Sequence, residues 1–180
     1  MSSIYDHQWI TAQRLGVGFQ LGRAAQLEDV LTWQPDTVVL ATGARMTWPQ
    51  DLPAPLKDLG VVPDLREAMA ALLTHRGPLQ GTAVIYDLDQ TEGTYAAAFL
   101  LAKKFSKVIL ITPREGVAQE TPLVTRQKIQ RAIFENHIEV RYLCEPWFSP
   151  TFSQDGGLGS ISVFGGEPSP IEDAVFFSWS

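Results

Sequence analysis

The sequence predicts an α/β fold, with a Rossmann-like, mainly parallel sheet flanked by helices and an antiparallel β meander near the C-terminus. Residues 82–87 and 107–112 are apolar runs of the kind that form buried strands, and the Ala- and Leu-rich segment 91–104 between them is typical of a helix. This βαβ unit predicts two parallel strands joined by a right-handed crossover. A helix pattern at 122–136 and a strand pattern at 138–143 continue the alternation.

The part of the chain before this unit is predicted to hold two helices and two strands. Apolar residues at helical spacing predict a helix over 5–15, and 27–33 fits a second, short helix. Strict alternation of apolar residues over 17–21 predicts a strand. The β-branched run 37–41 follows a Pro-Asp turn and predicts a buried parallel strand.

Prolines separate these elements from the βαβ unit. The segment 46–63 contains four of them and is predicted to be a connector. Asp64, with Glu67 three residues later, predicts the N-cap and capping box of a helix over 65–73. An antiparallel meander is expected from strand patterns at 147–152, 159–164 and 171–178. Gly- and Pro-rich turns at 154–157 and 165–170 separate these strands.

Composition excludes several classes of function. Fourteen basic and twenty acidic residues give a net charge of −6 without a Lys/Arg cluster, so nucleic acid is not an expected partner. Cys144 is the single cysteine, which excludes an internal disulfide, a paired-cysteine zinc site and a cysteine-ligated iron–sulfur cluster. No signal peptide or bilayer-spanning run is present, so a cytoplasmic location without membrane attachment is expected.

The end of the predicted strand 37–41 carries the candidate cofactor-binding residues Ala41, Thr42 and Gly43. Small residues there lie at the carboxyl end of a parallel strand, where open α/β sheets bind ligands. Glycine lets a backbone approach a nucleotide closely. The alternative is a tight turn that only ends the strand.

This motif also carries a family resemblance. Residues 36–45, DTVVLATGAR, resemble the D-x-V-V-x-A-T-G-A strand of two-dinucleotide-domain flavoprotein reductases. The order of motifs is similar to the C-terminal dinucleotide-binding region of the trimethylamine dehydrogenase and 2,4-dienoyl-CoA reductase family, which are old-yellow-enzyme-like NADH:flavin oxidoreductases. Four further segments support the resemblance, at 15–22, 83–87, 107–113 and 173–178.

The resemblance implies a truncated, nucleotide-binding-type portion of a flavin-dependent oxidoreductase, of the amine dehydrogenase/demethylase or enoate reductase type. It implies FAD or ADP for the intact protein, with FMN and an iron–sulfur cluster in a flavin barrel domain or subunit that would be the partner. The isolated chain is then expected to be inactive and to hold no catalytic residue. The alternative function is a non-catalytic Rossmann-like docking or assembly module. A second copy of the chain, forming a homo-oligomer, is the other partner considered.

The resemblance also divides the chain. Four regions are expected: a partial FAD/ADP-type lobe without its Gly-rich turn at 1–48, a connector and helix at 49–81, a degenerate NAD(P)-type βαβ lobe at 82–170, and a strand returning to the first lobe at 171–180.

The turn after strand 82–87 departs from a dinucleotide-binding pattern. Asp87, Asp89 and Glu92 place three carboxylates where phosphate would lie, and Gly93 alone remains of a glycine series. Like charge opposes phosphate binding, so strong NAD binding is not expected. Asp89 and Thr91 are interpreted as N-caps of the following helix.

Other polar residues are interpreted without a chemical role. Arg114 follows the second strand and is either a 2′-phosphate ligand or, as we favour, a solvated arginine. His7, His75 and His137 lie on separate predicted elements, and Cys144 is expected to be a small apolar side chain. No metal site is therefore predicted.

Overall fold

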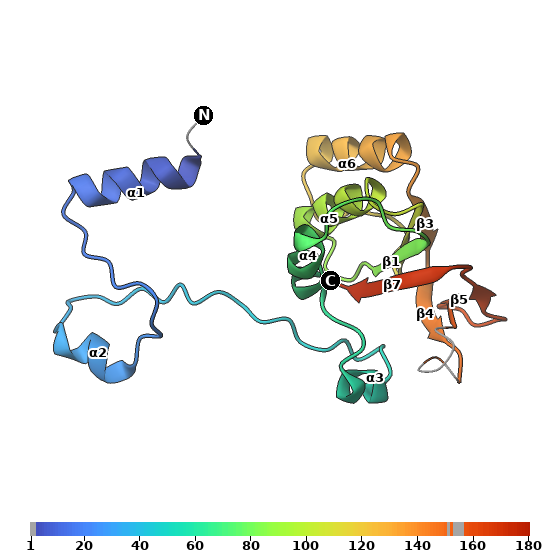
Figure 1. The fold of residues 1–180 in the computed structure, drawn as a ribbon, viewed down its shortest axis with the longest axis horizontal. Coiled ribbons are helices and arrows are strands. Elements are labelled where there is room, and N and C mark those ends of the chain that lie inside the picture. Colours follow the sequence, from blue (N-terminus) through green and yellow to red (C-terminus); the bar gives the residue numbers. More distant parts are fainter. Residues whose placement is uncertain (1–2, 151, 153–156) are drawn as a thin grey trace. The chain divides into compact units, whose positions relative to one another are not determined.

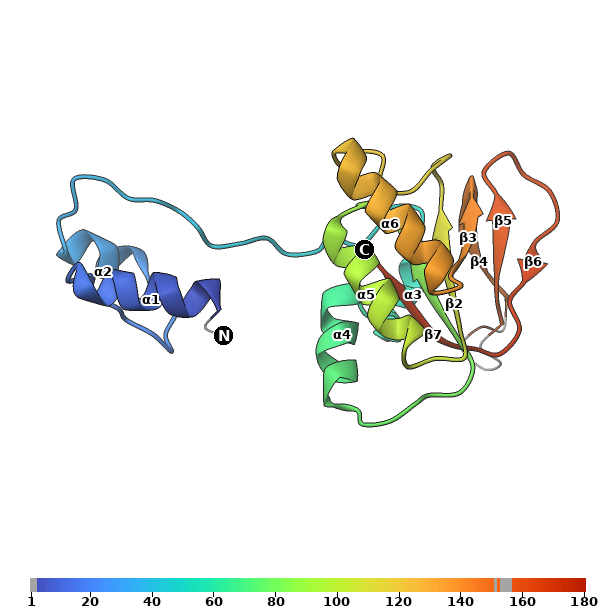
Figure 2. The ribbon, with the colours of Figure 1, turned by 90° about the horizontal axis from the view of Figure 1, so that it is seen from above.

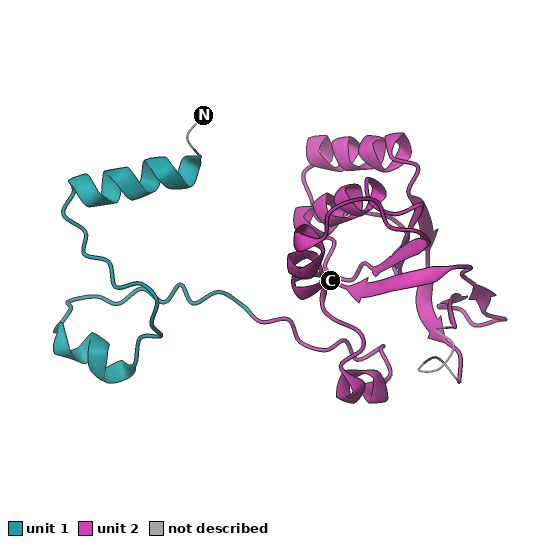
Figure 3. Ribbon diagram, in the orientation of Figure 1, with its two compact units in different colours: residues 1–44 teal, residues 45–180 magenta. Residues whose placement is uncertain are grey.

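The computed structural model describes residues 3–150, 152 and 157–180. The chain forms two compact units, Met1–Ala44 (unit 1) and Arg45–Ser180 (unit 2) (Figure 3). Each unit is described by itself.

Unit 1 contains two helices, which confirms both helix predictions for this region. Helix α1 spans Ile4–Arg14 and begins with a capping box. There Ser3 Oγ accepts the Asp6 N–H at 3.2 Å, and Asp6 Oδ2 accepts the Ser3 N–H at 2.8 Å. Helix α2 spans Leu27–Thr32, and Asp29 in its first turn accepts the Gln26 N–H at 2.9 Å.

The two strands predicted in unit 1 do not form. Residues 17–21 and 37–41 have irregular backbone, so both strand predictions are wrong. Val38 and Val39 are 52% and 83% exposed, and none of residues 3–44 is buried. A strand satisfies its backbone groups only through a neighbouring strand. The described residues of unit 1 supply no such ladder of hydrogen bonds, so an apolar, β-branched pattern was not sufficient to form a strand.

Unit 2 is built around a four-stranded parallel sheet in the order β3-β2-β1-β7 (Figure 1). Its strands are β1 (Thr82–Tyr86), β2 (Lys107–Thr112), β3 (Glu139–Tyr142) and β7 (Ala174–Trp179). The central strands β1 and β2 are buried on both faces, as their continuous apolar runs predict, apart from Lys107 at the start of β2. This confirms the predicted α/β class and its mainly parallel sheet.

Helices cover one face of the sheet (Figure 2). They are α4 (Leu65–Thr74), α5 (Glu92–Ala102) and α6 (Leu123–Glu135). Asp64 caps α4 as predicted, with Oδ1 accepting the N–H groups of Arg66 and Glu67 at 2.9 and 3.0 Å. Ile85 and Leu110 on the sheet pack with Leu101 of α5 in the core on this side.

A second sheet and a short helix cover the other face. The antiparallel sheet consists of β4 (Cys144–Phe148), β5 (Leu158–Ser162) and β6 (Ser169–Pro170). It confirms an antiparallel sheet near the C-terminus, but not all of its predicted strands. β4 begins three residues before the expected start at 147, and β6 lies in the predicted turn 165–170. The predicted turn at 154–157 lies outside the described residues except for Gly157.

Two expectations for unit 2 need correction. Helix α3 (Ala54–Leu59) lies inside the predicted connector, because prolines at its N-cap and in its first turn are compatible with a helix start. The strand pattern at 171–178 is predicted to be the third strand of the antiparallel meander. The structure instead pairs β7 in parallel with β1, with Ile85 opposite Ser178.

Candidate functional site at the carboxyl edge of the parallel sheet

The strand order reverses at β1. The chain passes from β1 to β2 to β3 in one direction, whereas β7 lies on the other side of β1. Open α/β sheets bind ligands beside the carboxyl ends of the strands at such a topological switch point. Asp89 and Ser180 lie there, because each follows the end of one of the two strands concerned.

Two cavities adjoin this point. One, of about 270 Å³, lies against α4 and α5 and is lined by Met69, Thr94 and Ala97 among others. The second, of about 520 Å³, is lined by Arg45, Trp48 and Trp179 among others. Met46, Asp89 and Ser180 line both cavities, so the two cavities adjoin each other at these residues.

The wall of the larger cavity is aromatic. The Trp48 and Trp179 rings meet edge to face with centroids 5.9 Å apart, and Trp48 Nε1 donates to the Leu52 carbonyl at 3.2 Å. Trp179 Nε1 is buried and has no hydrogen-bond partner among the described residues. These two tryptophans pack in the core of unit 2, whereas Trp33 in unit 1 is 66% exposed.

In the turn between β1 and α5, the Asp89 carboxylate accepts hydrogen bonds from residues of the turn and of α5. Asp89 Oδ1 accepts the Thr91 N–H at 3.0 Å and the Thr94 hydroxyl at 2.8 Å, while Oδ2 accepts the Thr91 hydroxyl at 3.1 Å. Thr91 is the N-cap residue of α5, but its side chain makes no capping hydrogen bond. Asp89 thus bonds the N-cap residue from outside the helix, which refines the predicted capping role.

These residues do not fit a pyrophosphate. A phosphate at the start of α5 would meet the Asp89 carboxylate, which already uses the Thr91 N–H, and Glu92 lies in the first turn. Both negative charges oppose an anion at that position. The carboxylates at the carboxyl end of β1 therefore oppose a dinucleotide phosphate.

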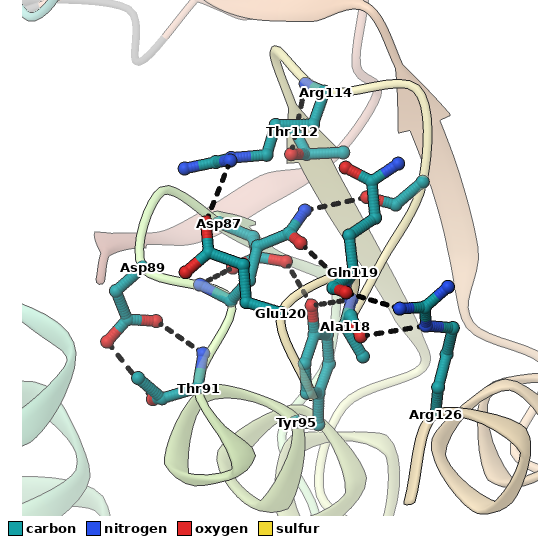
Figure 4. A network of polar contacts seen from close by, with 12 residues as sticks. Asp87, Asp89, Thr91, Tyr95, Thr112, Arg114, Ala118, Gln119, Glu120 and Arg126 are labelled. Carbon is teal, nitrogen blue, oxygen red and sulfur yellow. Dashed lines mark hydrogen bonds and ion pairs between the residues drawn. The ribbon is translucent and has the colours of Figure 1, made fainter. Parts of the chain in front are cut away.

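Asp87, directly after β1, is fully buried (Figure 4). Its Oδ1 accepts the Gln90 N–H at 3.0 Å, and its Oδ2 accepts the Tyr95 hydroxyl at 2.9 Å. Burial raises the pKa of Asp87 to about 6, and these two hydrogen bonds only partly offset that rise. Burial also raises the pKa of the Tyr95 hydroxyl, which stays protonated and able to donate.

Gln90 joins this turn to the loop that follows β2. Its Nε2 donates to the Gly116 carbonyl at 2.6 Å, and its Oε1 accepts the Gln119 N–H at 2.9 Å. The side chain is almost fully buried, and its backbone is left-handed with φ +51°. Because a non-glycine residue rarely adopts this conformation, the surrounding hydrogen bonds must hold it there.

Tyr95 and Arg126 secure the same loop from two helices. The Tyr95 hydroxyl accepts the Ala118 N–H at 2.6 Å, and Arg126 Nε donates to the Ala118 carbonyl at 3.1 Å. Arg126 Nη2 also donates to the Gln119 carbonyl. Ala118 is fully buried at φ +55°, a second left-handed position in the same network.

Arg114 is partly exposed and pairs with Glu120 across the loop at 3.2 Å. This ion pair fits the interpretation of Arg114 as a loop residue. An exposed pair of this kind adds little stability, at most about 1 kcal/mol.

The predicted cofactor-binding residues Ala41, Thr42 and Gly43 lie in unit 1, on an irregular and exposed segment. Gly43 has φ +77°, and no atom lies within 4 Å of the position that a Cβ would occupy. Its backbone is therefore open to close approach, but the described residues place no phosphate-binding donor set around it. Cofactor binding by these three residues stays a prediction.

The remaining candidates show no chemical constellation. His75 is the C-cap residue of α4, and Cys144 is a free, half-buried residue at the start of β4. Within the described part of the chain, no three His, Cys, Asp or Glu side chains gather as metal ligands. No helix among the described residues has the length and apolar character needed to cross a bilayer.

Sequence reasoning missed the roles of Gln90, Tyr95 and Ala118. The signal for Tyr95 was a hydroxyl inside an otherwise apolar helix, eight residues after an aspartate that ends a strand. Gln90 and Ala118 carried no signal, because their left-handed backbones and buried contacts depend on two loops that meet only in the fold.

Several solved structures share this fold over part of their length. The 6-hydroxypseudooxynicotine amine oxidase from Pseudomonas geniculata N1 matches 87% of this chain with a TM-score of 0.66 and 20% identity. Histamine dehydrogenase from Rhizobium sp. 4-9 matches 66% with a TM-score of 0.53 and 25% identity. 2-Naphthoyl-CoA reductase, solved with 2-naphthoyl-CoA, matches 96% with a TM-score of 0.69 and 14% identity.

The matches cover 23%, 17% and 24% of those three chains, so this chain spans at most about a quarter of each. No protein-family model and no curated protein sequence matches it. The three proteins are flavoproteins of the trimethylamine dehydrogenase-like and old-yellow-enzyme-like kind, which confirms the resemblance seen in the sequence. The chain therefore has the fold of a small portion of flavin-dependent amine dehydrogenases and reductases.

Proposed function

We propose that this chain is the nucleotide-binding-type portion of a flavin-dependent oxidoreductase, of the amine dehydrogenase/demethylase or enoate reductase type, and that it is not catalytic by itself. The observation that carries the proposal is the fold match, which takes in 87% of this chain but 23% of an amine oxidase. Among the described residues at the switch point of β1 and β7, no nucleophile, base and orienting group are in contact, which favours a non-catalytic lobe over a complete active site.

Within this proposal, the two units differ in what they bind. Unit 1 contributes Ala41, Thr42 and Gly43 to an FAD or ADP site that a flavin barrel domain or subunit completes. Unit 2 binds no NAD, because Asp89 opposes phosphate at the start of α5.

The test is to purify the full chain and assay it with added FMN, FAD and NADH, using an amine or an enoate with an artificial electron acceptor. We expect no turnover by the chain alone. A tagged chain expressed in its native cells should co-purify with a flavin-containing polypeptide, detected by flavin fluorescence. Turnover by the isolated chain, or recovery without any flavoprotein, would contradict the proposal.

Binding is tested separately by calorimetric titration of the chain with FAD, ADP and NADH. We expect weak or absent binding of each, since the Asp89 and Glu92 carboxylates oppose phosphate at the start of α5. A submicromolar dissociation constant for NADH would overturn our interpretation of the β1–α5 turn.

A docking or assembly module is the second candidate, favoured by the exposed apolar surface of unit 1. Leu40 and Trp33 are 83% and 66% exposed there. Large exposed apolar groups mark interaction surfaces in soluble proteins. Sedimentation of the chain over a range of concentrations separates a homo-oligomer from a monomer that requires a different partner.

A further inference from the structure

We propose that Gln90 closes the dinucleotide groove of unit 2 from within, because its side chain joins the same two loops that the adenosine half of a dinucleotide would join. The inference rests on the proposed function and deepens it. Unit 2 is taken as a nucleotide-binding-type lobe, and Gln90 is a second barrier to NAD besides the Asp89 carboxylate.

Gln90 lies where the glycine pattern of a dinucleotide-binding turn requires its second glycine. Gly93, in the first turn of α5, fits the last glycine of a G-x-G-x-x-G series, so the second glycine falls three residues earlier. That glycine lets the backbone approach the pyrophosphate closely. Gln90 keeps a left-handed backbone, at φ +51°, but adds a long side chain to it.

The Gln90 side chain fills the space between the β1–α5 turn and the loop 113–121 after β2. Its Nε2 donates to the Gly116 carbonyl at 2.6 Å, and its Oε1 accepts the Gln119 N–H at 2.9 Å. We call these two hydrogen bonds the Gln90 bridge. The side chain is 2% exposed. A dinucleotide places its pyrophosphate at the turn after the first strand and its ribose beside the residue that follows the second. The Gln90 bridge therefore lies across the path between these two positions.

The free space at this edge of the sheet supports the same interpretation. The cavities of about 270 Å³ and 520 Å³ are lined by residues of α4, α5 and the end of β7, among others, and neither is lined by Gln90 or by the loop 113–121. The two cavities thus give access to Asp89 and Ser180 but not to the end of β2. The groove is open on the β7 side of β1 and closed on the β2 side.

The loop 113–121 has other contacts that hold it in place. The Tyr95 hydroxyl accepts the Ala118 N–H at 2.6 Å, and Arg126 Nε donates to the Ala118 carbonyl at 3.1 Å. Replacing Gln90 by glycine leaves these contacts intact and suits the left-handed backbone. The substitution therefore removes the Gln90 bridge without removing the loop that it joins.

The test is a fluorescence titration of NADH into the full chain and two variants. Asp89→Ala/Glu92→Gln removes both opposing charges and frees the Thr91 N–H, but it keeps the Gln90 bridge. The second variant adds Gln90→Gly. All three proteins retain unit 1, so the wild-type titration is the reference for any contribution from that unit.

We expect saturable NADH binding only in the triple variant, at least about tenfold tighter than in the double variant. Saturable binding by the double variant, or no binding by the triple variant, would overturn the Gln90 bridge as a barrier and leave the proposed function standing. Binding by the wild-type chain would contradict both.

Hydrogen–deuterium exchange tests the Gln90 bridge without a ligand. Asparagine tolerates a left-handed backbone but has a shorter side chain, so in Gln90→Asn the Gln119 N–H loses its acceptor and should exchange about tenfold faster. The Ala118 N–H, bonded to Tyr95, should keep its protection and is the internal control. Equal exchange of the Gln119 amide in Gln90→Asn and wild type would contradict the proposal even if the triple variant fails to fold.

Discussion

Among the residues that the structure describes, units 1 and 2 both form helices, but only unit 2 forms strands. Helices α1 and α2 satisfy their backbone groups locally and begin with Asp6 and Asp29 in their first turns. The run 37–41 is as apolar and β-branched as β1, yet Val39 is 83% exposed whereas Ile85 is fully buried. The difference is that β1 has β2 on one side and β7 on the other. Strand patterns therefore become strands only where the same fold supplies a ladder.

The largest difference in stability between the units is expected when one apolar residue of each unit is truncated to alanine. Ile85→Ala removes a fully buried side chain from the central strand and should lower the free energy of unfolding by about 3 kcal/mol. Val39→Ala in unit 1 should change it by less than about 0.5 kcal/mol. Urea denaturation followed by circular dichroism measures both. Equal losses would show that unit 1 has a core of its own.

Two glycines, Gly81 in unit 2 and Gly22 in unit 1, provide a second comparison of the units with a smaller expected change in stability. Gly81 has φ +93°, and a Cβ there would lie 2.8 Å from the Asp173 carbonyl oxygen, which accepts the Thr82 N–H between β7 and β1. Gly81→Ala should therefore cost about 2 kcal/mol of unfolding free energy. Gly22→Ala, at φ +74° with open space around it, should leave the unfolding of unit 2 unchanged. A denaturation midpoint that shifts equally in both variants would contradict this account.

Helix caps give the smallest expected effect. Asp64→Ala removes the acceptor for two N–H groups of α4, which packs on the core, and should cost about 1 kcal/mol. Ser3→Ala removes the corresponding acceptor of α1, in a unit without buried residues, and should lower helical content without moving the main thermal transition. Thermal melts that shift by the same amount would indicate that the two units unfold as one.

Much of unit 2 could be predicted from the sequence because its signals are local. The alternation that forms β1, α5, β2, α6 and β3 was visible in apolar periodicity, and the Asp64 cap in residue type. The place of β7 was not visible in the sequence, because the pattern of Ala174–Trp179 fits either sheet. Only its pairing with β1 in the fold decides between the two sheets. For the candidate site, the unfavourable carboxylates were predictable. The left-handed backbones of Gln90 and Ala118 could not be predicted, because they depend on contacts between residues distant in sequence.

The central claim is that a strand pattern in this chain needs a paired neighbour, which β1 has and the segment 37–41 lacks. Amide hydrogen exchange of the full chain tests it most directly. We predict strong protection for Val84 and Ile109, and exchange close to the unprotected rate for Val39 and Leu40. Protection of Val39 comparable to that of Val84 would contradict the account, because it would require a sheet around 37–41 within this chain.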